Sequence, residues 1–188
     1  SETQLLEALR RYSTIPDLLK KNNILAEFVT GINNQKTRRP IGEFAFGEVE
    51  DDLDRYLKRV ENLNRGEEWS IAYFGLHGAS PEIWDRVKQF IDSLSNIVGA
   101  RPAGRVDVDC FIGRYSSTPS GIHVDGAHNF GFTFRSGKTM FTWPGHRQEL
   151  CGLKSPAYDN FKRESQPLQN NVETLCYFPH DALHVAET

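Results

Sequence analysis

Two histidines and one aspartate form the part of the sequence that could do chemistry. His123 and Asp125 are separated by one residue, and the later segment over 177–184, which contains His180 and His184, supplies another histidine at the start of the last apolar stretch. Side chains alternate between the two faces of a β-strand, so positions 123 and 125 point the same way if this segment is a strand. Two imidazoles and one carboxylate, with coordination positions left open, suit the oxygen chemistry of non-haem Fe(II). The pattern therefore predicts a metal site formed by His123, Asp125 and a histidine of this later segment.

The residues that follow this site show strand-like alternation. Three phenylalanines alternate with other residues over 129–135, and Ser136-Gly137 is typical of a two-residue turn into a second strand over 138–143. This pattern predicts a hairpin in which Arg135 lies opposite Lys138. Either its aromatic face packs on a core and its polar face meets water, or its aromatic face packs beneath other elements and its polar face lines the mouth of a barrel. The nearby metal-ligand candidates favour the second arrangement.

The first third of the chain has helical spacing instead. Apolar residues recur at helical intervals over residues 2–30 and are interrupted at 13–16, which predicts two short amphipathic helices. Residues 49–63 repeat the helical pattern. We therefore assign residues 1–65 to a helical region that packs on the rest of the chain or forms a homodimer.

One strand and one capped helix are expected next. Residues 67–76 alternate as a strand does. Ser80 can accept hydrogen bonds from free helix amides and Pro81 suits a first helical turn, while the apolar stripe from Ile83 to Leu94 predicts a buried side. Short β-segments dominate the remainder, so residues 66–188 are assigned to a mainly β domain.

Composition limits the function classes. The 188 residues suffice for one domain with a core, and 22 basic against 25 acidic residues offer no electrostatic reason to expect nucleic acid as a partner. The three cysteines have no Cys-x-x-Cys spacing, which argues against a disulfide framework or a zinc ribbon and favours a reducing compartment. No apolar run approaches the length of a membrane span, and the first residues do not form a signal sequence. We therefore expect a soluble cytoplasmic protein.

The segment from His123 to Lys138 resembles the core of JmjC-type, cupin-fold 2-oxoglutarate oxygenases. This group includes protein asparaginyl hydroxylases and histone demethylases. In the asparaginyl hydroxylase branch, an asparagine six residues and a lysine fifteen residues beyond the first iron histidine contact 2-oxoglutarate. Asn129 and Lys138 stand at those spacings. The resemblance thus assigns both residues to the co-substrate site.

The resemblance extends over residues 106–188. The distal histidine of the family commonly lies five residues after a proline, and the interval from Pro179 to His184 matches, whereas His180 does not. A hydroxyl residue three positions before the first ligand often helps to hold the co-substrate, and Ser120 takes that place. The remaining histidines are expected to be non-ligands, with His128 the nearest neighbour of the site.

The family implies a double-stranded β-helix, or jelly roll, preceded by helices. Such barrels normally continue with a further strand beyond the distal histidine, whereas only four residues follow His184 in this sequence. Fe(II) would be held by the two histidines and Asp125, with 2-oxoglutarate and O2 completing its coordination. Lys138 would pair with the 5-carboxylate. Oxidative decarboxylation would yield succinate and CO2 and allow attack on a C–H bond, and Asp125 leaves no room for the halide that a halogenase needs.

The substrate stays open at this stage. A protein or peptide side chain is the leading class by family analogy, and a small molecule, a free amino acid, an RNA base or a methylated residue are alternatives. A non-catalytic cupin module that binds metal or another ligand is the rival from a different class. The segment over 145–171 is a lid or a mobile insert, and Tyr115 and Trp143 either line the substrate mouth or pack in a core.

Overall fold

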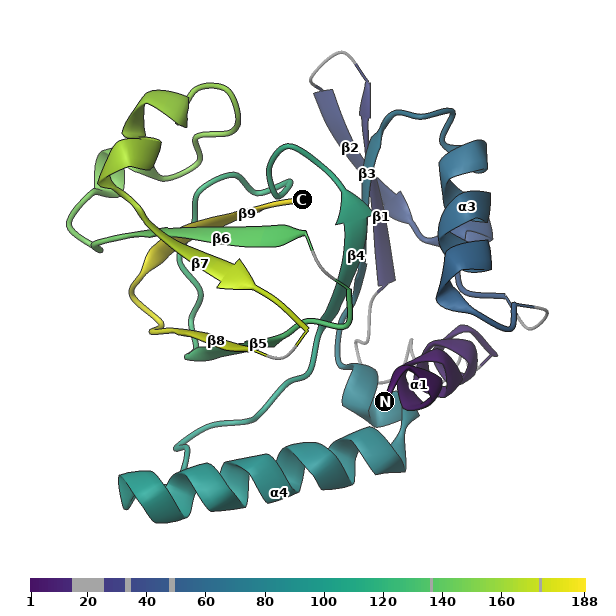
Figure 1. Ribbon diagram of the computed structural model, residues 1–188, viewed down its shortest axis with the longest axis horizontal. Helices are drawn as coiled ribbons and strands as arrows, with labels where there is room; N and C mark the ends of the chain where they lie inside the picture. The colour runs from purple at the N-terminus through teal and green to yellow at the C-terminus, as the bar shows by residue number, and fades with distance from the viewer. Residues whose placement is uncertain (15–25, 33–34, 48–49, 136, 173) are drawn as a thin grey trace. The chain divides into compact units, whose positions relative to one another are not determined.

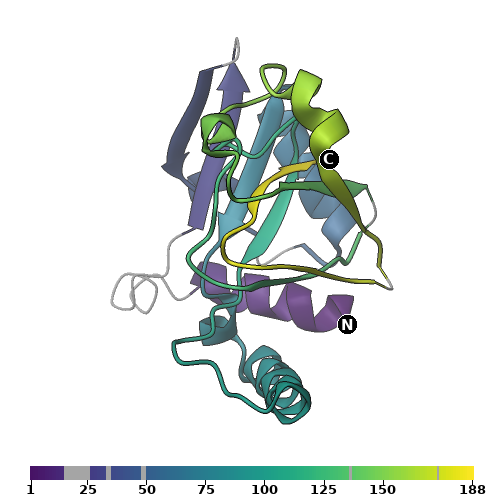
Figure 2. The same ribbon diagram turned by 90° about the vertical axis from the view of Figure 1, so that its left-hand side faces the viewer.

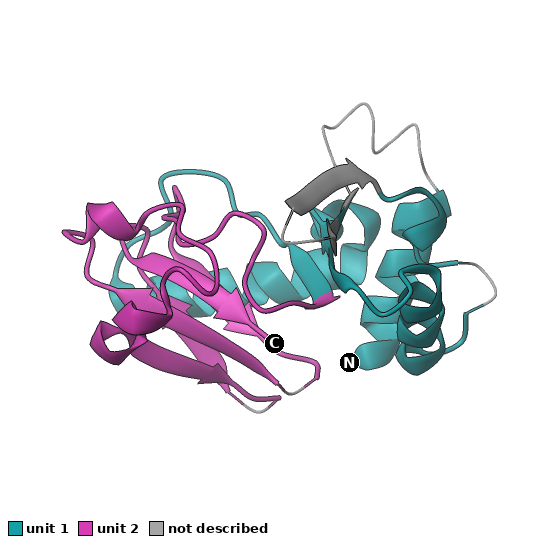
Figure 3. Cartoon of the chain, turned by 90° about the horizontal axis from the view of Figure 1, so that it is seen from above, with its two compact units in different colours: residues 1–112 teal, residues 113–188 magenta. Residues whose placement is uncertain are grey.

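The structure is a computed structural model that describes residues 1–14, 26–32, 35–47, 50–135, 137–172 and 174–188. The described chain is mixed α/β, with small antiparallel sheets and an N-terminal helix. It divides into two compact units, residues 1–112 and 113–188 (Figure 3). The sequence predicted a boundary after residue 65, where the spacing of apolar residues changes. The boundary between the two compact units instead lies between residues 112 and 113, within a β-strand. None of the described helices is long and apolar enough to cross a membrane.

The first unit combines helices with one four-stranded sheet in the order β2-β1-β3-β4. Figures 1 and 2 show α3 against one face of this sheet. In chain order, with η for 3-10 helices, its elements are α1 (Glu2–Thr14), β1 (Ala26–Ile32), β2 (Gln35–Pro40), η1 (Gly42–Phe44), α3 (Leu53–Leu63), β3 (Glu68–Tyr73), η2 (Leu76–Ala79), α4 (Pro81–Val98) and the start of β4 (Cys110–Arg114).

The first of the two short helices expected over residues 2–30 is confirmed as α1. Two further expected elements of this unit are also confirmed, and one is wrong. The helix expected over 49–63 is α3, and the strand expected over 67–76 is β3. The second N-terminal helix falls partly on residues 15–25, outside the described residues. Its remainder is wrong, because residues 26–32 form β1, which pairs antiparallel with both β2 and β3. Its β-branched and aromatic residues suit a strand, and pairing on both edges overrides a weak helical spacing.

Helix α4 begins as predicted but is less buried than predicted. Ile83 donates its backbone N–H to Ser80 Oγ at 3.2 Å, and Pro81 is the first helical residue. Of the helix residues only Ser95 is buried, and Trp84 is 43% exposed. The prediction that the apolar stripe of α4 is buried is therefore wrong. Sequence periodicity shows which residues share one face of a helix, but it does not show whether other elements cover that face.

The core of the first unit joins α1 and α3 to β3. Tyr56 and Tyr73 are fully buried, and their hydroxyl groups lie 3.0 Å apart. Tyr56 also donates to the backbone oxygen of Phe44 at 2.8 Å. Burial raises the pKa of both phenols, so they act as neutral hydrogen-bonding groups inside an otherwise apolar core.

The second unit contains two small antiparallel sheets, with orders β5-β8 and β7-β6-β9. Figure 1 shows β6 between β7 and β9. A single bridge between His123 and His184 adds the segment around residue 123 to the free edge of β9. The described strands do not close into a barrel. After the end of β4, the elements are β5 (Asn129–Phe132), β6 (Lys138–Trp143), η3 (Gln148–Leu150), η4 (Asp159–Glu164), β7 (Gln166–Asn170), β8 (Leu175–Phe178) and β9 (Leu183–Glu187).

The hairpin expected from β5 and β6 is wrong. Both strands exist, but β5 pairs with β8 and β6 pairs with β7 and β9. Residues 133–137 carry the chain from one sheet to the other, and Ser136 of the expected turn lies outside the described residues. Period-two alternation shows which residues share a face, and it does not name the partner strand.

The two faces of the β7-β6-β9 sheet have different roles. Its outer face packs against the part of the segment over 145–171 that precedes β7, in an apolar cluster that includes Trp143, Leu150 and Tyr158. Leu150 and Tyr158 have no exposed surface, so this segment is a packed layer, and Trp143 is a core residue. The inner face shares a second cluster with β8, through contacts among Met140, Cys176 and their neighbours. The β7-β6-β9 sheet therefore packs its inner face against the β5-β8 sheet.

Candidate metal centre

Backbone pairing places the two predicted histidine ligands side by side. His123 donates its N–H to the oxygen of His184 at 3.0 Å, and His184 donates back at 2.8 Å. Residues that exchange both hydrogen bonds project their side chains to the same face. On its other side His184 is paired with Thr142 of β6. His184 is thus carried by β9 and His123 by the segment bridged to it, and their ring centroids are 4.3 Å apart.

The segment before His123 is fixed by a close approach of two backbones. Ile122 donates to the oxygen of Leu153 at 2.8 Å and accepts from Gly152 at 2.7 Å. Gly121 has φ +71°, and a Cβ added there would lie 2.4 Å from the Leu153 oxygen. Only glycine fits this position without displacing the backbone. The sequence search for ligands missed this residue, since its constraint arises from a segment 32 positions away.

Backbone carbonyl groups determine which nitrogen of each histidine faces the site. Nδ1 of His123 lies 2.8 Å from the oxygen of Gly121, and Nδ1 of His184 lies 3.0 Å from the oxygen of Ala182. A carbonyl oxygen can only accept, so each Nδ1 carries the proton and donates it. In the neutral ring, Nε2 is then left with a free electron pair. Such an orienting bond is the usual companion of a metal-ligating histidine.

Asp125 completes the group. Its Oδ1 lies 3.6 Å from Nε2 of His123, and its Oδ2 lies 3.4 Å from Nε2 of His184. Across the described residues this is the one set of three histidine, cysteine or carboxylate side chains whose ligand atoms all lie within 4.8 Å of one another. Two ligands at right angles with bonds of about 2.1 Å are about 3 Å apart. The three side chains could therefore hold a metal ion after a small contraction.

The electrostatics favour the forms that bind metal. Contact with His184 is the largest effect that lowers the pKa of Asp125, with smaller contributions from His123 and the Asn129 amide, while burial opposes them. Burial is the main cause that lowers the pKa of His123. At neutral pH the site therefore presents a charged carboxylate beside a neutral imidazole, which are the ligating states of both groups.

The structure brings the two predicted co-substrate residues to the same interior. Asn129 is the first residue of β5, lies opposite Phe178 and influences the Asp125 carboxyl. Lys138 begins β6 and is paired with Asn170. Burial raises the pKa of the Cys176 thiol, and the nearby charge of Lys138 opposes this rise. Lys138 therefore faces the inner side of the sandwich.

Ser120 lies against a histidine ligand. Its Oγ is 3.2 Å from Nδ1 of His123, and the side chain is exposed. The same Nδ1 already donates to the carbonyl of Gly121 at a shorter distance. The structure thus places Ser120 where it can help to orient the ligand ring, and its role toward a co-substrate stays a prediction.

The neighbouring histidines lie outside the three-residue group. His180 is exposed, stacks on His128 with centroids 5.0 Å apart, and lies 3.8 Å from Asp181. His128 is hydrogen-bonded through Nδ1 to the Tyr177 hydroxyl at 2.9 Å. The two histidines therefore contact each other and Tyr177 of β8. These contacts do not support the expectation that His128 lies next to the metal ligands.

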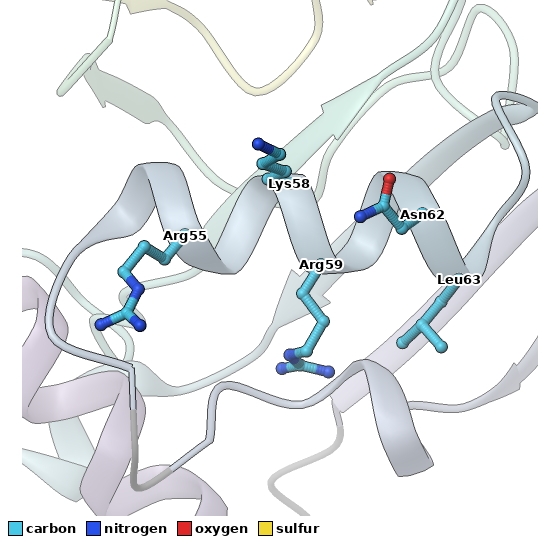
Figure 4. Close-up of a pocket in the computed structure, with 5 residues that line it drawn as sticks. All are labelled: Arg55, Lys58, Arg59, Asn62 and Leu63. Carbon is cyan, nitrogen blue, oxygen red and sulfur yellow. The ribbon is translucent and has the colours of Figure 1, made fainter.

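A basic hollow on the first unit has a different character. It lies along α3 and is lined by Arg55, Lys58, Arg59, Asn62 and Leu63 (Figure 4). Arg59 donates to Glu50 at 2.6 Å, so part of its charge is already matched. The lining includes no histidine, cysteine or carboxylate. The His-Asp-His group is consequently the stronger candidate for chemistry.

Comparison with known proteins adds no family. Neither the protein-family models nor the curated proteins with which the sequence was compared include a match.

Proposed function

We propose that the second unit belongs to an Fe(II)- and 2-oxoglutarate-dependent oxygenase that hydroxylates a C–H bond, with release of succinate and CO2. One observation carries the proposal: two Nε2 atoms and a carboxylate converge while both Nδ1 protons are committed to carbonyl groups. Each of these three side chains can act as a metal ligand once its imidazole or carboxyl group is deprotonated. The chemistry of this donor set, two imidazoles and one carboxylate, fits iron(II) with open positions.

The strand pairing supports a jelly roll as the fold of this unit. Residue 123 pairs with 184, β5 with β8 and β6 with β7, so three segments pair with three later segments in reverse order. This is the pattern of one long antiparallel hairpin. The additional pairing of β9 with β6 brings the outermost segment beside the innermost one, as happens when such a hairpin rolls up.

The inner face of β6 supports a co-substrate site between the metal ligands and Lys138. Thr142 pairs with His184, and Lys138 lies four residues away on the same face. Four residues of strand span roughly 13 Å. The lysine stem covers part of this distance, and the rest suits a five-carbon dicarboxylate whose other end chelates the metal. Asn129 stands on the facing sheet, beside Asp125.

The protein residues then have separate tasks. The histidines and Asp125 hold the metal through three positions, and their hydrogen bonds to Gly121 and Ala182 fix the ring orientation. Lys138 matches the 5-carboxylate, which makes the burial of that anion acceptable. The apolar cluster around Met140 packs between the two sheets of this unit. Bound Fe(II), with 2-oxoglutarate and O2, supplies the oxidising chemistry itself.

A protein or peptide side chain is the proposed substrate. The resemblance to asparaginyl hydroxylases supports this class, and the balanced charge of the chain gives no support to nucleic acid. A cytoplasmic setting is proposed with it, because Cys110, Cys151 and Cys176 form no disulfide bond with one another and a reducing compartment keeps iron as Fe(II).

Co-substrate turnover tests the proposal. Purified protein with Fe(II), ascorbate, O2 and 2-oxoglutarate should release succinate slowly even without a substrate. Asp125→Ala and Lys138→Ala should abolish this release, whereas His180→Ala, a histidine outside the group, should retain it. Binding of 2-oxoglutarate to the Mn(II)-loaded protein measures the same site without turnover. Equal values for wild type and both site variants in the two assays would contradict the proposal.

The same measurements separate the alternatives. A protein that binds Mn(II) through Asp125 but shows neither 2-oxoglutarate binding nor succinate release is a metal-binding module without turnover. If succinate release is present, candidate peptides and free amino acids are compared for the gain of one oxygen atom by mass spectrometry. Stimulation by free amino acids alone would replace the protein or peptide substrate with a small molecule.

A further inference from the structure

An unsatisfied amide lies inside the second unit. Asn170, the last residue of β7, is 4% exposed. Its Oδ1 is fully buried, and the structure gives it no hydrogen-bond partner among the described residues. Buried polar atoms in native proteins are almost always hydrogen-bonded, so an exception calls for a specific reason. A ligand that supplies or rearranges the missing contact is one such reason.

The surroundings of this amide point to the space between the two sheets. Asn170 is the direct partner of Lys138 across the β6-β7 ladder, so both side chains lie on the inner face. On the facing sheet, a Cβ added to Gly131 would lie 3.5 Å from Asn170 Nδ2 and 3.5 Å from the Cys176 Cβ. The amide is thus directed toward the one strand position of β5 that has no side chain.

We propose that Asn170 and Lys138 together recognise the distal carboxylate of a 2-oxo diacid, with Asn170 Nδ2 donating to the carboxylate and Oδ1 accepting from the Lys138 ammonium. This inference rests on the proposed function. It adds a residue that sequence spacing did not indicate, because the pairing of residue 138 with residue 170 is set by the β6-β7 register.

The amide supplies what a lysine alone does not. An ammonium is a point charge with freely rotating donors, so it attracts an anion without fixing its position. A neighbouring amide that accepts from the ammonium and donates to the carboxylate defines where the carboxylate lies. Since the other end of the diacid is held at the metal, this geometry selects the length of the diacid. Asn170 is therefore a specificity-determining residue. The affinity for pyruvate, which lacks the distal carboxylate, should not depend on it.

If Asn170 had only a structural role, its replacement would lower the stability of the unliganded protein, whereas the proposed role predicts that this stability is kept. Asn170→Leu keeps the size of the side chain and removes an acceptor that has no partner. Replacing such a group with an apolar one is neutral or stabilising. The unliganded variant should therefore unfold at the wild-type temperature or above it.

The decisive experiment compares two ligands on Mn(II)-loaded full-length chains by calorimetry. Asn170→Leu should bind 2-oxoglutarate about 10- to 100-fold more weakly than wild type, as expected for loss of a hydrogen bond to a charged group. Its affinities for Mn(II) and for pyruvate should stay unchanged. Asn170→Asp should lose more, because a second carboxylate repels the ligand. Gln169→Leu, an exposed amide on the adjacent position of β7, is the matched control.

Each other outcome overturns the inference in a distinguishable way. Unchanged 2-oxoglutarate affinity in Asn170→Leu removes Asn170 from the site and leaves the proposed function standing. Parallel losses of Mn(II), pyruvate and 2-oxoglutarate binding, with a lower unfolding temperature, assign the residue to structure alone. Absence of 2-oxoglutarate binding in the wild type overturns the proposed function, and the inference with it.

Discussion

The outer and inner faces of the β7-β6-β9 sheet differ in what they leave unsatisfied. On the outer face Trp143 is 2% exposed, and its Nε1 donates to the oxygen of Phe161 at 3.0 Å. Tyr158, on the layer that covers this face, donates to Glu187 at 2.6 Å. On the inner face the structure gives Asn170 Oδ1 no hydrogen-bond partner among the described residues, and the ligand atoms of His123, Asp125 and His184 lie within 4.8 Å of one another. On the outer face these polar atoms are hydrogen-bonded without a ligand, whereas on the inner face Asn170 Oδ1 is not.

This difference separates stability from chemistry on a single sheet. Closely packed apolar groups with satisfied polar atoms contribute to the free energy of folding. Polar groups that lack a partner in the unliganded protein reduce its stability, and proteins retain such groups mainly at functional sites. Substitutions on the two faces should therefore have different signatures: loss of stability on the outer face, and loss of binding on the inner one.

The largest effect is expected on the outer face. Trp143→Ala should lower the free energy of unfolding by about 3–5 kcal/mol, since it removes a large buried side chain and leaves a cavity. The folded fraction should bind Mn(II) within about 3-fold of wild type, because no metal ligand is lost. Denaturant unfolding and metal titration measure the two quantities. Phe132→Ala, at a side chain that is 62% exposed, is the control and should cost less than about 0.5 kcal/mol.

Removal of a ligand on the inner face should act on binding. His184→Ala should weaken Mn(II) binding by more than about 100-fold, because loss of residues that only orient ligands already costs 10- to 100-fold. His180→Ala changes an exposed histidine four positions earlier and should leave the affinity as it is. If both variants bind like wild type, the three-residue group is not the metal site.

A smaller effect is expected from the support of the ligands. Gly121→Ala introduces a Cβ at φ +71°, within 2.4 Å of the Leu153 oxygen, and must displace the carbonyl that orients His123. We expect metal affinity to fall by about 10-fold or more. Gly126→Ala is the matched control, since a Cβ there meets nothing within 4 Å. Equal affinities in the two variants would show that the Gly121 carbonyl does not orient the ligand.

The smallest effect is expected at Ser120. Its hydroxyl group shares the Nδ1 of His123 with the closer carbonyl of Gly121. Ser120→Ala should therefore change Mn(II) affinity by less than about 3-fold, the range of an exposed hydrogen bond. A large loss of 2-oxoglutarate affinity in this variant, with metal binding intact, would instead assign Ser120 to the co-substrate.

Local sequence signals predicted individual elements better than their partners. The Ser80-Pro81 start of α4 was predictable because a cap and a first turn involve only adjacent residues. The β5-β6 hairpin was wrong, since strand pairing is decided by contacts between residues far apart in sequence. For the same reason the N-terminal helical spacing did not reveal β1, whose two partners lie on either side of it.

The candidate site divides in the same way. The sequence by itself determined the ligand types and their likeness to a metal and co-substrate motif, because the His-x-Asp step and the spacings to Asn129 and Lys138 are local. Only the tertiary structure decided that His184 lies against His123, that Gly121 must be a glycine, and that Asn170 faces Lys138. These relations depend on backbone hydrogen bonds between distant strands. The backbone of every residue type can form such bonds, with proline lacking only the N–H donor, so the side-chain pattern does not identify them.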